Sequence, residues 1–88
     1  MSRMGSVTVR YYAGARAAAG VETELLSIPD DGLTVDGALR ALSQRHGPAL
    51  ERVLGACSFL LDEVAVRSFE TPLSEKSVLD VLPPFAGG

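Results

Sequence analysis

The residues best suited to chemistry stand together in the run Leu82-Pro83-Pro84-Phe85-Ala86-Gly87-Gly88. Proline lacks the N–H that a sheet ladder needs and holds φ at about −65°, so Pro83 and Pro84 predict a stiff, extended arm. Gly87 and Gly88 have no Cβ, which lets a backbone pass through a narrow channel without steric clashes. The run therefore predicts a slim arm that presents the carboxylate of Gly88.

A terminal carboxylate is ionised at neutral pH and is a poor electrophile. Its activation, as an acyl-adenylate or a thiocarboxylate, requires the chain end to reach deep into the active site of another protein. We therefore expect Gly88 to be the reactive residue, with Gly87 and Ala86 as the thin segment that enters the partner. The alternative reading of two terminal glycines is a frayed end without function.

Alternating apolar and polar residues predict the strands that must position this arm. In the first of these segments, residues 7–12, one face carries Val7, Val9 and Tyr11. The expected strands are residues 7–12, 22–28, 58–61, 64–67 and 78–82. The second is expected to pair antiparallel with the first, in a register that the pattern leaves open. The alanine-rich residues 13–20 predict a turn with a short helical segment.

One helix is predicted clearly, beginning after Thr34, whose side chain is a good N-cap. Its apolar positions follow the spacing of a single helix face and comprise Val35, Ala38, Leu39 and Leu42. Arg45 and His46 fall in its last turn, where positive charge suits the helix dipole, and Gly47 is placed to end it. Residues 49–54 predict a short second helix.

These elements admit few compact arrangements, because the helix must bury its apolar stripe against one face of the sheet. The first and last strands are then expected side by side in the middle of a mixed sheet of four to five strands, crossed by one main helix. This is an α+β fold of the β-grasp (ubiquitin-like) type. We expect residues 1–6 to be a flexible N-terminus, residues 7–82 the β-grasp domain, and residues 83–88 the extended C-terminal tail.

The last strand indicates where a partner would bind. If Leu79 and Val81 face the helix, Asp80 and Leu82 face the other way. Leu82 and Phe85 would then be exposed apolar anchors beside the tail, or Leu82 would cover a rim of the core. With Pro83 and Pro84 between these two anchors, residues 82–85 form the expected partner-binding segment.

Composition and the remaining reactive side chains argue against several functions. Eight basic and eleven acidic residues give a net charge of −3, which disfavours nucleic acid and membrane as partners. A single cysteine, Cys57, permits no internal disulfide and favours a cytoplasmic location. We expect Cys57 to be a core residue and His46 a surface cation, so a free-standing enzyme is disfavoured. No spacing suggests a metal site, and no glycine-rich phosphate loop precedes a helix.

Three stretches resemble the small subunit of molybdopterin synthase, a ubiquitin-like sulfur carrier. They are Tyr12-Ala13-Gly14-Ala15-Arg16 with Gly20, the helix entry Leu33-Thr34-Val35 with Ala38-Leu39, and Pro72-Leu73 with Leu82 through Gly88. The likeness runs from about Val7 to the end. The chain departs from the family pattern at Asp62-Glu63, where relatives often carry Asn, and at residues 74–77, which lack the usual Asp-Gly.

This resemblance implies a non-catalytic, sulfur-donating subunit. A ubiquitin-activating-like adenylyltransferase would adenylate Gly88 with ATP, and a sulfur donor protein would supply the sulfur of a C-terminal thiocarboxylate. The tail would then enter the large subunit of molybdopterin synthase, which holds the catalytic pocket, and deliver sulfur to cyclic pyranopterin monophosphate in molybdenum cofactor biosynthesis. No cofactor is expected on this chain itself.

Other functions remain open on the same residues. Sulfur carriers for thiamine or cysteine synthesis share the fold and the Gly-Gly end. A ubiquitin-like modifier would instead join its tail to lysines of other proteins. A β-grasp interaction module would not use the tail at all.

Overall fold

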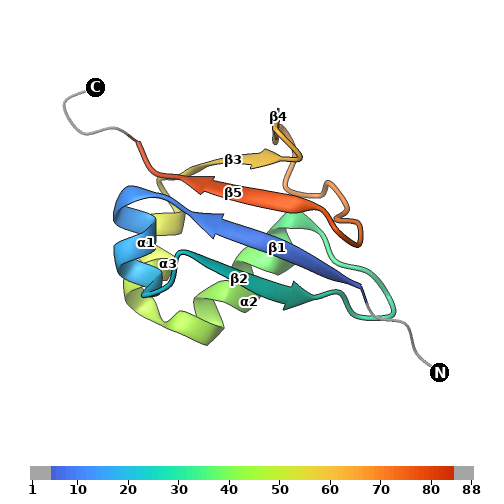
Figure 1. Ribbon diagram of the computed structural model, residues 1–88, viewed down its shortest axis with the longest axis horizontal. Helices are drawn as coiled ribbons and strands as arrows, with labels where there is room; N and C mark the ends of the chain where they lie inside the picture. The colour runs from blue at the N-terminus through green and yellow to red at the C-terminus, as the bar shows by residue number, and fades with distance from the viewer. Residues whose placement is uncertain (1–4, 85–88) are drawn as a thin grey trace.

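The computed structural model describes residues 5–84 of the 88-residue chain and shows a sheet with helices on one face (Figure 1). In chain order the elements are β1 (Ser6–Tyr11), α1 (Ala13–Ala19), β2 (Thr23–Ser27), α2 (Val35–His46), α3 (Pro48–Leu54), β3 (Ser58–Leu61), β4 (Val64–Ala65) and β5 (Val78–Leu82). The predicted order of elements is confirmed. The segment after β1 is a true helix, and β4 ends two residues earlier than predicted.

Within these residues the strands form one mixed sheet in the order β2-β1-β5-β3-β4. The two central strands, β1 and β5, run parallel, with Val9 opposite Leu79 and Tyr11 opposite Val81. β2 pairs antiparallel with β1, and β3 pairs antiparallel with both β5 and β4. The α+β architecture with the first and last strands at its centre is therefore as predicted.

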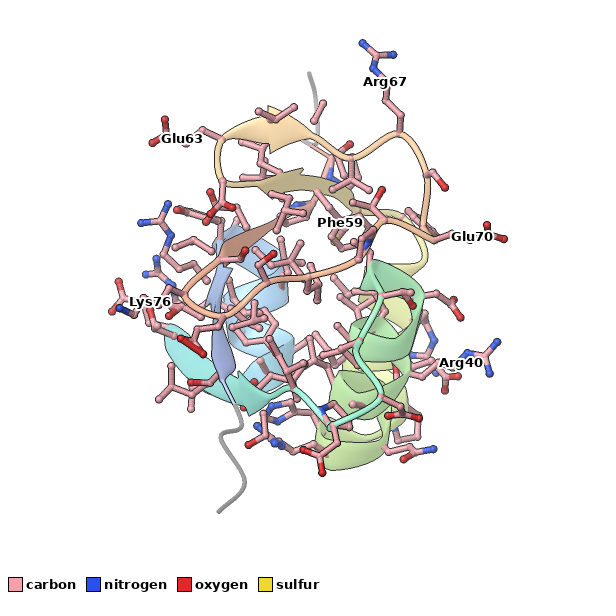
Figure 2. The ribbon with its side chains drawn as sticks, turned by 90° about the vertical axis from the view of Figure 1, so that its right-hand side faces the viewer. Arg40, Phe59, Glu63, Arg67, Glu70 and Lys76 are labelled. Atoms are coloured by element: carbon pink, nitrogen blue, oxygen red, sulfur yellow. The ribbon has the colours of Figure 1, made fainter. Side chains whose placement is uncertain are left out.

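The core lies between this sheet and the helices, which Figure 2 shows on one side of the strands. The predicted face of β1 is buried there, as are the inward residues of β5 and α2. The fully buried residues of these three elements are Val7, Val9, Val35, Ala38, Leu42, Leu79 and Val81, with Tyr11 nearly so. α1 adds its buried Ala15 and α3 its buried Leu50. The other face of the sheet has no helix over it within residues 5–84.

Capping residues set the ends of α2. Thr34 Oγ1 accepts a hydrogen bond from the Gly37 N–H at 3.1 Å, which satisfies one of the free amides of the first turn. At the other end Gly47 has φ +93°, a conformation that glycine adopts without a Cβ penalty. Pro48 then stands in the first turn of α3, where its missing N–H costs nothing. α3 therefore starts one residue earlier than predicted.

The β3–β4 hairpin turns at Asp62 and Glu63, both of which have positive φ, +50° and +72°. Two consecutive left-handed residues are typical of a type I′ turn, which matches the twist of the flanking strands and favours Asn-Gly or Asp-Gly. Asp62 suits its position, and Glu63 stands where glycine would be unstrained. The predicted turn is thus confirmed, and its second residue is strained.

Candidate functional site

The root of the predicted tail is held on both sides by the sheet. On β5, Val81 lies opposite Tyr11 of β1 and opposite Phe59 of β3, and Leu82 lies opposite Ser58. The Tyr12 N–H adds a hydrogen bond to the Val81 carbonyl oxygen at 3.3 Å. Val81 is therefore held on both sides and Leu82 on the β3 side, which agrees with the prediction of a rigidly based tail.

Three of the predicted site residues lie within the described part of the chain. Leu82 and Pro83 are partly buried, and Pro84 is exposed. The sequence left open whether Leu82 is an exposed anchor or covers a rim of the core, and its partial burial beside Ser58 of β3 lies between the two. Phe85, Ala86, Gly87 and Gly88 lie outside the described residues, so the roles assigned to them stay predictions.

The sheet face that the helices leave bare, here called the open face, carries the outward residues of the strands. The pairing register places one residue of each strand side by side across the middle of this face. Arg10 of β1 stands between Thr23 of β2 and Asp80 of β5. Leu60 of β3 and Ala65 of β4 continue this cross-strand row. By strand alternation Leu82 belongs to the next row. The open face and the root of the tail therefore form one continuous surface.

An ion pair occupies the centre of the open face. Arg10 Nε donates to Asp80 Oδ1 at 2.6 Å and Arg10 Nη2 to Asp80 Oδ2 at 3.1 Å, a bidentate geometry. The Asp80 side chain is only 6% exposed, whereas that of Arg10 is 43% exposed. The hydrogen bond and the charge of Asp80 raise the pKa of Arg10 above its ordinary value. Tyr12 Oη lies 3.4 Å from Asp80 Oδ1.

Strand alternation alone does not reveal this pair. Both residues occupy the polar positions of alternating strands, where a charged side chain is ordinarily solvated. The missing information is the parallel register that places residues 10 and 80 opposite each other. The sequence offers one indication of the pair: each of the two strands that are expected to be adjacent carries a polar residue.

A second polar cluster lies on the helix side, around Glu24 of β2. Its Oε2 receives the Tyr11 hydroxyl and contacts His46 Nε2, each at 2.6 Å, and its Oε1 accepts from Arg45 Nη1 at 2.8 Å. Burial alone would raise the pKa of Glu24, but the hydrogen bonds from Tyr11, Arg45 and His46 outweigh it and lower that pKa. The cluster ties β1, β2 and the end of α2 together.

This cluster corrects the expectation for His46. Its side chain is 15% exposed, pairs with Glu24 and stands edge-on to the Tyr11 ring, with centroids 6.2 Å apart. It is therefore a packed structural residue and not a free surface cation. Burial and the hydrogen bond to Glu24 raise the pKa of the Tyr11 hydroxyl far above its ordinary value, which keeps it a neutral donor.

The described residues offer little other reactive chemistry. Cys57 is partly buried, its thiol donates to the Val53 carbonyl oxygen at 3.2 Å, and burial raises its pKa, all of which oppose a role as nucleophile. Among residues 5–84 no group of three or more His, Cys, Asp or Glu side chains could hold a metal ion. No helix in that range is long and apolar enough to cross a membrane.

Comparison with known proteins identifies relatives along nearly the whole chain. The model of the ThiS family matches residues 9–88. A molybdopterin synthase sulfur carrier subunit from Chlamydomonas reinhardtii is 31% identical over 83 residues, which cover 93% of this chain and 98% of the relative. Both matches include most or all of the residues that position the tail.

Solved structures share the fold. The crystal structure of the small archaeal modifier protein 1 from Haloferax volcanii superposes with a TM-score of 0.81 at 30% identity, covering 96% of this chain and all of the other. A complex of subunits 1 and 2 of the molybdopterin-converting factor from Helicobacter pylori gives a TM-score of 0.68 at 27% identity, covering 98% and 100%. These ubiquitin-like neighbours confirm the predicted β-grasp fold.

Proposed function

The chain belongs to the ThiS family of ubiquitin-like sulfur carriers, and on that premise we propose that it supplies sulfur for molybdenum cofactor biosynthesis. The observation that carries the proposal is the match of residues 9–88 to the family, which runs to Gly87 and Gly88. The curated relative is itself a sulfur carrier subunit of molybdopterin synthase. The fixed end of β5 supports the same function, since it gives the tail a rigid base.

The proposed reaction takes place at Gly88. Its carboxylate attacks the α-phosphorus of ATP on an adenylyltransferase, and pyrophosphate leaves. The terminal sulfur of a donor protein's persulfide attacks the acyl carbon and displaces AMP, and a thiol then reduces the resulting acyl disulfide to the C-terminal thiocarboxylate. The tail then enters the large subunit of molybdopterin synthase, whose pocket holds cyclic pyranopterin monophosphate. The thiocarboxylate sulfur bonds to a carbon of this substrate, and water cleaves the acyl–sulfur bond, which returns Gly88 to its carboxylate. The catalytic groups belong to that subunit, while this chain contributes the sulfur and a docking surface.

The docking surface proposed here begins at the root of the tail. Leu82 and Pro83 are partly buried, so each still offers apolar surface that a partner can cover, and Pro84 is exposed. Phe85 would be the next apolar contact along the tail. The complex of the two Helicobacter pylori subunits supports a pairing of this kind.

Intact-mass spectrometry of the chain isolated from its own cells tests the proposal. We expect a species heavier than the unmodified chain by the difference between sulfur and oxygen, located at Gly88 by fragmentation. Deletion of Gly88, or addition of one alanine after it, should abolish both this species and sulfur transfer without lowering the melting temperature. Unmodified chain alone, in the presence of the activating enzyme, would refute sulfur carriage.

The structural likeness to a small archaeal modifier protein favours a second candidate, attachment of Gly88 to lysines of other proteins. Affinity purification under denaturing conditions separates the two functions, because an isopeptide conjugate survives denaturation and a docked carrier does not. A Lys76→Arg variant is the matched control, since Lys76 is the only lysine of the chain. It should leave sulfur carriage unchanged and would remove only conjugates built on this chain. Carriers for thiamine or cysteine synthesis are distinguished by which synthase accepts the sulfur.

A further inference from the structure

The centre of the open face holds a charged residue where an apolar one would pack. Arg10 stands on one of the two central strands, with almost half of its side chain exposed, while its partner Asp80 is nearly buried. A buried ion pair is weak evidence for stability, because desolvation offsets much of the attraction. Arginine at the centre of an interface is, in contrast, among the residues that most often dominate binding.

The pair leaves part of the guanidinium unused. Asp80 takes the Nε–H and one N–H of Nη2, which leaves both hydrogens of Nη1 and the second hydrogen of Nη2. Among the described residues no other acceptor is bonded to these groups, so water solvates them in the free protein. A partner that covers the open face removes this water and must offer oxygen atoms in return, or the complex is weakened.

The surroundings of Arg10 indicate which oxygen atoms fit. Arg10 lines a surface hollow with Asp62, Glu63, Val78 and Asp80, so one positive and three negative side chains meet there and the sum is −2. Asp62 Oδ1 already accepts the Val78 N–H at 2.9 Å. Figure 2 shows Glu63 projecting on the side of the molecule away from α2. A further carboxylate would be repelled by this excess, whereas an uncharged carbonyl oxygen would not.

We propose that Arg10, fixed by Asp80, determines partner specificity by donating its free N–H groups to an uncharged carbonyl oxygen, from the main chain or an amide side chain, of the subunit that receives the tail. The inference rests on the proposed function, because it takes the large synthase subunit as the occupant of the open face. Continuity supports that choice: Leu82 lies on the same strand and face as Asp80 and leads directly into the tail. A subunit that holds Gly88 therefore approaches across the row next to Arg10.

The test measures binding of the purified large subunit to the full chain and its variants. Arg10→Lys keeps the positive charge but loses the planar fork of donors, so it should weaken the complex by about tenfold, mainly through faster dissociation. Arg52→Lys is the matched control, since Arg52 is exposed on α3 on the opposite side of the sheet, and it should bind like the wild type. The melting temperature of each variant is measured in parallel.

A second variant distinguishes loss of binding from loss of folding. Replacing both partners, Arg10→Leu with Asp80→Leu, removes the ion pair together with its desolvation cost and should leave a folded domain. It should bind as weakly as Arg10→Lys or more weakly. Wild-type affinity in either variant would overturn the proposal, and so would a loss of affinity that merely follows a loss of melting temperature.

The salt dependence of the affinity distinguishes an uncharged carbonyl oxygen from a carboxylate as the acceptor. With an uncharged carbonyl oxygen as acceptor, the affinity ratio of wild type to the Arg10→Leu, Asp80→Leu variant, which lacks the charge of Arg10, should be nearly the same at low and high salt. A ratio that shrinks as salt rises would point to a partner carboxylate and overturn the assignment of an uncharged acceptor. Failure of the wild-type chain to bind the large subunit at all would overturn the proposed function, and the role of Arg10 with it. If the wild-type chain binds and both variants bind with the same affinity, only the role of Arg10 is overturned.

Discussion

Replacement of Glu24 by alanine is the sharpest test of how the domain is held together. The Glu24 carboxylate is 13% exposed and is contacted by Tyr11, Arg45 and His46, from β1 and α2. The substitution removes the only side chain that joins these three groups in the described residues. We expect a folded but markedly less stable domain.

The size of the effect follows from burial. Tyr11 is 1% exposed, so its hydroxyl would lose its acceptor where water does not replace it, at a cost of about 1–3 kcal/mol. The contact of Glu24 with His46 is similarly sheltered, whereas Arg45 is 46% exposed and contributes less than about 1 kcal/mol. A total loss of about 3 kcal/mol is expected, from a stability of about 4–13 kcal/mol for a domain of this length. The melting temperature should fall by about 12–24 °C.

Urea denaturation and thermal unfolding at neutral pH measure this loss. Glu22→Ala is the matched control, because Glu22 is 71% exposed and lies 3.5 Å from Arg16, and it should change stability by less than about 0.5 kcal/mol. A double-mutant cycle with Tyr11→Phe should give a coupling energy of about 1–2 kcal/mol between Tyr11 and Glu24. A loss below about 1 kcal/mol for Glu24→Ala, or no coupling, would refute the reasoning.

The same carboxylate predicts a pH dependence. The pKa of Glu24 is lower in the folded domain than in the unfolded chain, so the unfolded chain binds the proton more readily. The contribution of Glu24 is therefore fully present above its unfolded pKa and is lost as the pH falls through its folded pKa. Between neutral pH and acid, the wild type should lose more stability than Glu24→Ala does, and parallel pH curves would contradict this.

Three further predictions concern the turn, the helix cap and the thiol. Glu63→Gly should raise stability by about 0.5–1 kcal/mol, since glycine adopts the φ of +72° without strain; an unchanged melting temperature would argue against a strained turn. Thr34→Ala should lose about 1 kcal/mol in urea denaturation because the Gly37 N–H loses its acceptor, while Thr34→Ser should retain most of the stability. Cys57 should react with a maleimide much more slowly in the folded domain than in denaturant, because burial raises its pKa; equal rates would contradict the packing described here.

Periodicity was sufficient to predict the elements and the inward faces. Val7, Val9 and Tyr11 alternate as a half-buried strand must, and α2 follows its apolar spacing between a threonine cap and a glycine. The central position of β1 and β5 followed from the few ways to cover one helix stripe. The local pattern was sufficient for the inward faces, because the spacing of apolar residues within one strand or helix determines which of its faces is buried.

The polar pairs could not be predicted from the same pattern. Arg10 and Asp80 are separated by 70 positions and meet only through a parallel register, and Glu24 meets His46 across 22 positions. Each of these residues looks like ordinary surface until its partner is known. The positive φ of Glu63 could not be predicted either, because glutamate is not a residue that this position of the turn favours.

The parallel pairing of β1 with β5 has a kinetic consequence. β5 is the last strand in sequence, yet it lies between the β1–β2 pair and the β3–β4 hairpin, so its departure would divide the sheet. We therefore expect amide hydrogen exchange at the interior residues of β5 to require global unfolding, because their hydrogen bonds break only when the sheet divides. The strand up to Val81, which is paired on both sides, should then persist for as long as the native state, and with it the direction in which the chain leaves the sheet.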